Sequence, residues 1–298
     1  MLAFTGRGRR YLWTDAYAVC NWLGLGERER ALRLVDEVHQ TLGRHGGRWL
    51  DGASEAHPTR GGLRIGKPLP ERAPGERIDE RREWDRDGQY FHYLTRWMHA
   101  LHQVSRATSE ERFEQWAREL AEAAERAFVK DGRMVWKMSV DLSRPLVASM
   151  GQHDPLDGYV SCLEIGAPAA AYQRMLAGVE LVTSDPLGIG GLLDDALRME
   201  RLKLDPSGVL AAARDGLQHV SLRDPPWQRL AFRELGLAIG LHAAERLAIP
   251  GEIARFIPLA EEIEAFWLRH AGDSGWSDHQ DINDVMLATS FAPAGWLD

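Results

Sequence analysis

Residues 28–43 read Arg-Glu-Arg-Ala-Leu-Arg-Leu-Val-Asp-Glu-Val-His-Gln-Thr-Leu-Gly. The apolar side chains recur every three or four residues, and charged side chains fill most of the positions between them. The apolar stripe consists of Ala31, Leu32, Leu34, Val35, Val38 and Leu42. An apolar stripe opposite a charged one predicts an amphipathic helix that packs its stripe against a core.

The same spacing recurs along the chain and decides the fold class. Residues 109–129 repeat it, and further helices are predicted over 228–247 and 252–270. Alternation typical of strands is confined to about residues 134–140, which is enough for a short hairpin arm and too little for a sheet. We therefore expect an all-α protein of about eleven helices with mostly short connections.

Several helix starts are marked by capping residues. Aspartate precedes proline at Asp154, Asp185, Asp205 and Asp224. Aspartate accepts backbone N–H groups at a helix start, and proline suits the first turn, so we interpret these four aspartates mainly as caps. Thr108, followed by Glu111, likewise predicts a capping box. Such spacing suits successive helical hairpins stacked in a ring or a solenoid.

Composition limits the class of partner. The 298 residues include 36 Lys and Arg against 44 Asp and Glu, a formal net charge of −8. An acidic chain without a basic stripe disfavours nucleic acid and anionic membranes as partners.

No signal peptide or membrane span is evident, so we expect a cytoplasmic protein. The length allows two domains, but helical toroids often use such a length as one, and we expect one domain over 1–298. The oligomeric state stays open.

Familiar cofactor signatures are missing from the sequence. It contains no Walker loop, dinucleotide fingerprint, His-Glu-x-x-His or Cys-x-x-Cys motif. Cys20 and Cys162 are too few and too scattered for a zinc site. The glycine-rich residues 188–191 precede a helix rather than follow a strand, so we interpret them as a helix entry. No cofactor or metal site is predicted.

Residues 48–86 form the one long connection without periodicity. Four prolines and five glycines interrupt this stretch. A structureless loop of this length inside a compact domain is usually functional or disordered. We interpret it as a lid or rim over a site; the alternative is a solvated insertion with an ordinary mixture of charges.

Residues 84–93 are the densest polar stretch and open a helix predicted to run to about Val104. On that helix one face carries Gln89, His92, Arg96, His99 and Gln103. The face lacks the Lys and Glu that water-facing helices usually carry, so we expect it to line an internal cleft. The alternative is an ordinary wet face. Asp85 and Asp87 would then sit at the positive end of the helix.

Two further clusters and one isolated carboxylate complete the candidates. Residues 149–158 combine His153 with two aspartates, of which Asp157 is harder to explain as a cap. Residues 276–284 mix acids, amides and imidazole, including His279. Asp15 lies in an apolar run, where a buried carboxylate is costly unless it is paired or used. Eleven tryptophans add flat faces that can stack on sugar rings.

Four segments together resemble a known group of proteins: residues 13–16 (Trp-Thr-Asp-Ala), 85–93, 149–158 and 184–195. They resemble an uncharacterised bacterial family that we associate with the six-hairpin glycosidase-like superfamily of (α/α)6 toroids. The resemblance implies two concentric rings of helices with a polar cleft at one end. It also implies sugar chemistry, because similar toroids include inverting glycoside hydrolases and sugar 2-epimerases with paired histidines. This chain shows no complete motif of either, and eleven helices leave the ring one short.

The leading hypothesis is a glycoside hydrolase with a small-molecule or glycan substrate. Asp87 and Asp157 would be its acid and base, with Asp15 in reserve. The substrate-binding candidates are Trp13, Trp84, Asp85, Gln89, His92, Arg96, Trp97, His153, Trp276 and His279. The first alternative is an epimerase or isomerase in which His92, His153 or His279 moves a proton beside a carbonyl. The second is a non-catalytic helical binding or scaffold protein.

Overall fold

The computed structural model describes residues 9–248 and 251–298. Helices make up 58% of the protein, and strands are few and short, which confirms the predicted helical class. The described residues form fourteen α-helices, more than the eleven expected, because several are single turns. Within these ranges, no helix has both the length and the apolar character needed to cross a bilayer.

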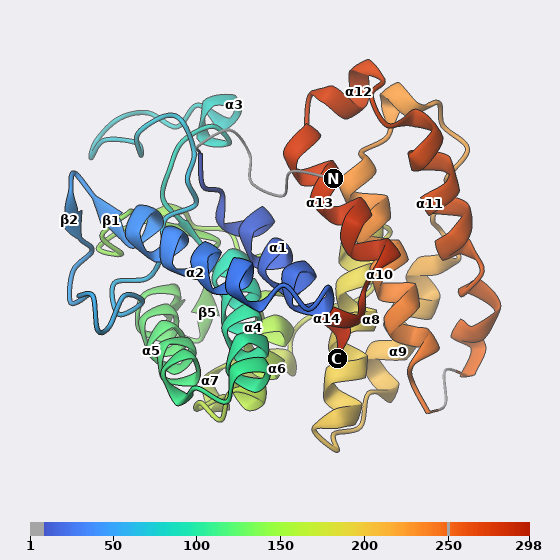
Figure 1. The fold of residues 1–298 in the computed structure, drawn as a ribbon, viewed down its shortest axis with the longest axis horizontal. Helices are drawn as coiled ribbons and strands as arrows, with labels where there is room; N and C mark the ends of the chain where they lie inside the picture. The colour runs from blue at the N-terminus through green and yellow to red at the C-terminus, as the bar shows by residue number, and fades with distance from the viewer. Residues whose placement is uncertain (1–8, 249–250) are drawn as a thin grey trace. The chain divides into compact units, whose positions relative to one another are not determined.

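The described chain forms two compact units. One lies within residues 9–178, coloured blue to yellow-green in Figure 1, and the other lies within residues 179–298, coloured yellow to red. Each unit has its own buried helices and is described by itself below. The expectation of one domain over 1–298 stays a prediction.

The first unit is built from pairs of consecutive helices (Figure 1). Helices α1 and α2, α4 and α5, and α6 and α7 pack against each other, and α4 also contacts α1 and α6. Their bounds are α1 Leu12–Gly24, α2 Arg28–Leu42, α4 Phe91–Thr108, α5 Glu111–Phe128, α6 Asp154–Glu164 and α7 Ala170–Leu176, with a single-turn α3 at Glu80–Glu83. The helices predicted over 28–43 and 109–129 are thus confirmed.

Short strands fill the connections of this unit. Two hairpins pair β1 (Arg44–His45) with β2 (Arg48–Trp49) and β4 (Val129–Lys130) with β5 (Arg133–Met134). A three-stranded sheet has the order β3 (Gln89–Tyr90), β6 (Lys137–Met138) and β7 (Pro145–Val147). The prediction of a single short hairpin arm therefore underestimates the strands. Residues 89 and 90, which we expected to be helical, form the additional strand β3.

The start of α4 differs from the prediction for a local reason. Gly88 has a φ of 145°, in the region that favours glycine, and Gln89 and Tyr90 pair with β6. The helix therefore begins at Phe91 and not near residue 85. Asp85 and Asp87 precede the helix instead of lying in its first turn, and Gln89 does not share a face with His92.

The capping box predicted at Thr108 is wrong. Thr108 is the last residue of α4, and Ser109 leaves the helix with a φ of 58°. Glu110 stands at the N-cap of α5 without a side-chain cap, and its backbone N–H instead bonds the Thr108 hydroxyl at 3.2 Å. The polar pair marks the turn between two helices and not the start of one.

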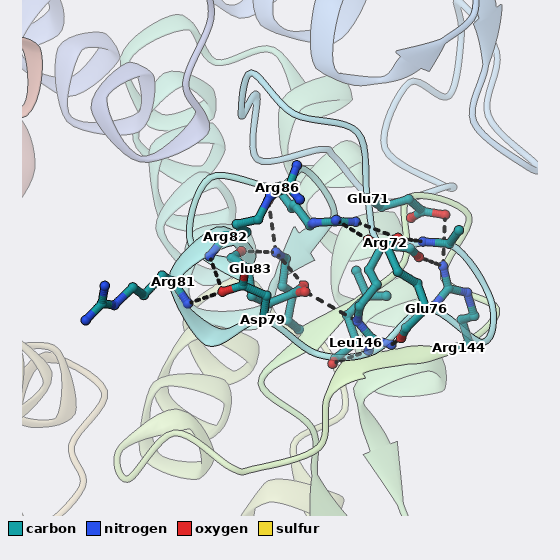
Figure 2. Close-up of polar contacts among 12 residues, drawn as sticks. Glu71, Arg72, Glu76, Asp79, Arg81, Arg82, Glu83, Arg86, Arg144 and Leu146 are labelled. Carbon is teal, nitrogen blue, oxygen red and sulfur yellow. Dashed lines mark hydrogen bonds and ion pairs between the residues drawn. The ribbon is translucent and has the colours of Figure 1, made fainter.

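Ion pairs fix the irregular segment 69–86, as Figure 2 shows. Arg72 lies 3.4 Å from Glu83 and donates to the carbonyl of Leu146 in β7 at 2.9 Å. Arg86 pairs with Glu76, and Arg144 lies 3.6 Å from Glu71. The segment is thereby attached to the three-stranded sheet and to itself.

A buried lysine anchors the end of this segment. Lys137, on β6, is fully buried, and its Nζ donates to Glu83 Oε1 at 3.1 Å, to the Glu83 carbonyl at 2.8 Å and to the Arg86 carbonyl at 2.9 Å. Breaking a buried pair by losing one partner is costly, about 3–5 kcal/mol. Residues 83–86 are therefore held firmly in place by Lys137, while the interpretation of the loop as a lid or rim over a site stays a prediction.

The second unit is also a set of packed helices (Figure 1). Helix α10 contacts α8, α11 and α13, and α8 contacts α9. The bounds are α8 Pro186–Arg201, α9 Ser207–Leu217, α10 Ala231–Glu245, α11 Leu259–His270, α12 Ser274–Ser277, α13 Gln280–Phe291 and α14 Ala294–Leu297, with 3₁₀ turns η1 Pro226–Gln228 and η2 Gly251–Phe256. The helix predicted over 252–270 is split by Pro258, which lacks an N–H and restricts the residue before it.

Glycines let α8 and α10 come into backbone contact. A Cβ atom at Gly190 would lie 2.1 Å from the carbonyl oxygen of Gly236, and one at Gly240 would lie 2.4 Å from the carbonyl oxygen of Gly190. The glycine-rich entry at 188–191 is helical, as expected, and its glycines serve this close packing. Asp185 caps α8 by accepting the N–H of Gly188 at 3.1 Å, which confirms one of the predicted caps.

Candidate functional site

An aromatic wall lies where the starts of α1 and α4 meet the β5–β6 connection. The His92 ring stacks on Tyr90 at 5.4 Å and on Trp136 at 5.9 Å between centroids. Trp13 lies 6.0 Å from His92, and Trp84 lies 5.1 Å from Trp136. Trp84 is 54% exposed and Trp136 is half-buried, so this end of the wall reaches solvent.

A carboxylate pair from α6 lies close to the same helix, α4. Asp154 and Asp157 are 4% and 5% exposed, and they stand one turn apart at the start of α6. Arg96 of α4 donates from Nη2 to Asp157 Oδ1 at 3.3 Å, and its guanidinium lies 6.0 Å from the Trp13 ring. Arg96 therefore connects the carboxylates to the aromatic wall.

The two carboxylates have different partners. Asp154 Oδ2 accepts the backbone N–H of Gly151 at 3.0 Å. Burial, and to a smaller extent the negative charge of Asp157, raise the pKa of Asp154 to about 7 against the opposing effects of the Gly151 N–H and Arg96. Close to neutral pH, Asp154 can hold or release a proton while Asp157 faces a guanidinium.

The imidazole of the wall is shifted in the opposite direction. Burial lowers the pKa of His92 to about 4, although the nearby Asp157 favours the charged ring. His92 is therefore neutral at pH 7, with one ring nitrogen able to accept a proton. Burial thus favours the uncharged forms of both His92 and Asp154.

Nε1 of Trp13, whose side chain is 4% exposed, and Nδ1 of His92 are buried nitrogen atoms at the site without a hydrogen-bond partner among the described residues. Most buried polar atoms in proteins are hydrogen-bonded, so such atoms need an explanation. Both belong to the ring pair 6.0 Å apart, and a bound polar molecule would satisfy them.

The predicted residues Trp13, Trp84, His92, Arg96 and Asp157 are thus brought together within one unit. His153 is the N-cap residue of α6 and neighbours the pair along the chain. The face of α4 that carries Arg96, His99 and Gln103 is buried, so it is not an ordinary wet face.

Asp87 contacts the irregular loop that precedes α4. It pairs with Arg64, and its Oδ1 accepts the backbone N–H groups of Gly66 at 3.0 Å and Lys67 at 3.3 Å. Its position before α4, set by Gly88, turns it toward the loop. In this structure the carboxylate of Asp87 holds the loop in place, and its role as a catalytic acid or base stays a prediction.

Gln89 is also structural. Its side chain is fully buried, accepts the N–H of Leu63 at 2.8 Å, and donates to the carbonyls of Gly61 and Val140 at 3.0 and 2.8 Å. A side-chain amide with these partners has no exposed group for a sugar hydroxyl. Asp85 is exposed, and its backbone carbonyl bonds Leu69.

Trp97 and Asp15 belong to the core of the first unit. Trp97 has no exposed surface, and its Nε1 donates to His39 Nε2 at 3.1 Å, so it cannot serve as a sugar platform. Burial lowers the pKa of His39 to about 3, which keeps it a neutral acceptor. Asp15 lies 3.5 Å from Arg10 and accepts the N–H of Tyr11, so this buried carboxylate is paired.

Trp276 and His279 belong to the second unit. Trp276 is 3% exposed and donates from Nε1 to Asp284 at 3.0 Å. His279 is exposed at the N-cap of α13, 5.6 Å from the Phe232 ring.

Two members of the site were missed. The Asp-Pro pair led us to interpret Asp154 as a cap, yet His153 holds the N-cap position and Asp154 is the first helical residue. The sequence signal was the second aspartate three residues later, which places two carboxylates on one helix face. Trp136 adjoins a strand, and its spacing predicted nothing about the distant His92.

Within residues 9–248 and 251–298, no group of three or more His, Cys, Asp or Glu side chains is arranged to hold a metal ion. Comparisons of the chain with protein-family models, with curated proteins and with solved structures found no match.

Proposed function

We propose that this protein is a carbohydrate-active enzyme, most simply a glycoside hydrolase, with Asp154 and Asp157 as its carboxyl pair. The observation that carries the proposal is the difference in environment between these two neighbours. Asp154 has a pKa of about 7, whereas Asp157 lies against Arg96. A carboxyl group with a raised pKa beside a second carboxyl group that is paired with a guanidinium is an arrangement typical of an acid and its partner.

In this mechanism Asp154 donates its proton to the oxygen of the scissile glycosidic bond. Asp157 supplies the negative charge, either to activate a water molecule or to attack the sugar directly. Arg96 holds Asp157 in place, and Trp13 Nε1 and His92 Nδ1 bind hydroxyl groups. The exposed ring of Trp84 and the half-buried ring of Trp136 support the apolar face of a sugar.

The proposal includes the finer architecture that the resemblance implies. Consecutive helix pairs such as α1–α2, α4–α5 and α6–α7 support a fold of helical hairpins. We propose that these hairpins belong to an (α/α)6-type toroid, which an experimental structure would test. We further propose that the protein works in the cytoplasm on a small-molecule or glycan substrate.

The first experiment is a screen of aryl glycosides and soluble glycans for new reducing ends at pH 6. With an active substrate, Asp154→Asn should lower kcat/KM by about 100-fold or more while the circular dichroism spectrum is unchanged. Asp205→Asn is the matched control, because Asp205 also precedes a proline but accepts the N–H of Ser207, the first residue of α9, at 2.9 Å. Full activity of Asp154→Asn would remove Asp154 from the mechanism.

A second candidate function has its own supporting observation. The neutral His92, with Nδ1 unbonded within the described chain, suits a base that removes a proton beside a carbonyl, as in an epimerase or isomerase. Incubation of sugars in deuterium oxide distinguishes the two functions. If the wild type incorporates deuterium at a sugar carbon and releases no new reducing ends, the protein is an isomerase or epimerase. The variant His92→Gln should then lose this exchange.

A further inference from the structure

The second unit contains a small pocket that the proposed function does not use. Its volume is about 220 Å³, and it lies between the η1 turn and α12. The lining residues are Pro226, Trp227, Trp267, Asp273, Gly275 and Trp276. Three indoles and one carboxylate therefore surround a space below the roughly 300–1,000 Å³ of a pocket for a drug-sized ligand.

The indole N–H groups of the two buried tryptophans are already used. Trp267 donates to Glu234 Oε2 at 2.8 Å, and Trp276 donates to Asp284 Oδ1 at 3.0 Å. Their ring centroids are 6.1 Å apart. These two residues offer the pocket their ring surfaces and not their donors, which suits a polyhydroxylated ligand poorly because each hydroxyl seeks a donor and an acceptor.

The one charged side chain among the described lining residues, Asp273, favours a cation. Asp273 is an exposed carboxylate that accepts from His270 Nδ1 at 2.8 Å through one oxygen. Trp227 is 71% exposed, so its ring is open to an incoming group. Aromatic faces attract cations through their quadrupole, and aromatic cages recognise quaternary ammonium groups in this way.

An arginine outside the lining already exploits the same surface. Arg229 lies 3.9 Å from the Phe266 ring and 5.4 Å from the Trp267 ring, and its charge is balanced by Glu234. The aromatic cluster thus binds one cation within the protein. We propose that the pocket binds a second, a methylated ammonium group such as that of choline or trimethyl-lysine, with Asp273 as the counter-charge.

The test is a titration of the full chain followed by tryptophan fluorescence and calorimetry. Choline and a trimethyl-lysine peptide should bind, and 3,3-dimethylbutan-1-ol, a neutral molecule of the same shape as choline, should bind at least tenfold more weakly. A preference for choline would indicate a free small molecule, and a preference for the peptide would indicate a modified protein. Methyl glucoside serves as the sugar probe.

Variants locate the binding. Trp227→Ala and Asp273→Asn should each weaken choline binding about tenfold or more. Trp84→Ala, which removes an exposed tryptophan of the first unit, should leave it unchanged. Equal binding of the neutral molecule, stronger binding of methyl glucoside, or unchanged affinity in both pocket variants would overturn the proposal. The readout is binding at the second unit, so it is independent of the hydrolase assay.

Discussion

The negative charge of Asp157 raises the pKa of Asp154, one turn earlier on α6, and only the burial of Asp154 contributes more to that shift. Asp157 is itself bonded to Arg96 of α4. The three side chains join two helices whose residues are about 60 positions apart in the chain. As a result, Asp154 can gain or lose a proton near neutral pH, and this is the central chemical property of the site.

The first prediction concerns stability against pH. An aspartate with a raised pKa binds its proton more tightly in the folded state, so its contribution to stability is full below about pH 4 and is lost as pH rises to about 7. The free energy of unfolding of Asp154→Asn relative to the wild type should therefore rise by about 3–4 kcal/mol over that window. Urea unfolding at pH 4, 5.5 and 8 measures it.

The matched variant Asp205→Asn should show the opposite trend. Hydrogen bonds from Ser207 lower the pKa of Asp205, so its contribution is present at neutral pH and lost on acidification. A difference between Asp154→Asn and the wild type that does not change with pH would contradict the raised pKa.

The second prediction concerns the aromatic wall. With a substrate from the screen, Trp84→Ala should raise KM about three- to tenfold with little change in kcat, because a stacked ring contributes about 0.5–1.5 kcal/mol. Thermal unfolding should be nearly unchanged, since Trp84 is 54% exposed. Trp227→Ala, the exposed tryptophan of the second unit, is the control. Equal KM values in the two variants would exclude Trp84 from substrate binding.

The third prediction concerns the buried lysine. Lys137→Met should lower the free energy of unfolding by about 3–5 kcal/mol, because it removes the buried cation of the Glu83 carboxylate and leaves Glu83 with Arg72 at 3.4 Å. Hydrogen exchange over residues 67–87 should increase at the same time. The exposed Lys130→Met should change stability by no more than about 0.5 kcal/mol.

A double variant separates the pair from simple loss of packing. Lys137→Met with Glu83→Gln should recover part of the lost stability, because the amide carries no charge. Additive losses would show that the ion pair is not what anchors the rim.

The fourth prediction uses two glycines. Gly190→Ala should destabilise the protein by about 1–3 kcal/mol or more, because its Cβ atom would meet the backbone of α10 at 2.1 Å. Gly208→Ala, in α9, has no atom of the described chain within 4 Å of its Cβ position and should stabilise by up to about 1 kcal/mol. Thermal and urea unfolding compare the two; equal effects would argue against backbone contact between α8 and α10.

The sequence by itself determined the helical class and most of the long helices. Apolar spacing is a local property, so the stretches at 28–43 and 109–129 could be recognised without knowing their partners. Capping chemistry is local too, and it identified Asp185 correctly. The sequence also identified Trp13, His92, Arg96 and Asp157 as candidate site residues.

Tertiary structure decided which of those residues meet. Asp87 and Asp157 look alike in sequence, but a strand and Gly88 turn one toward Arg64, while α6 brings the other to Arg96. The raised pKa of Asp154 arises from its burial in the folded unit and from its helix neighbour Asp157. Burial, ion pairing and proton affinity depend on what surrounds a group in space, and residues far apart in the chain provide most of those surroundings.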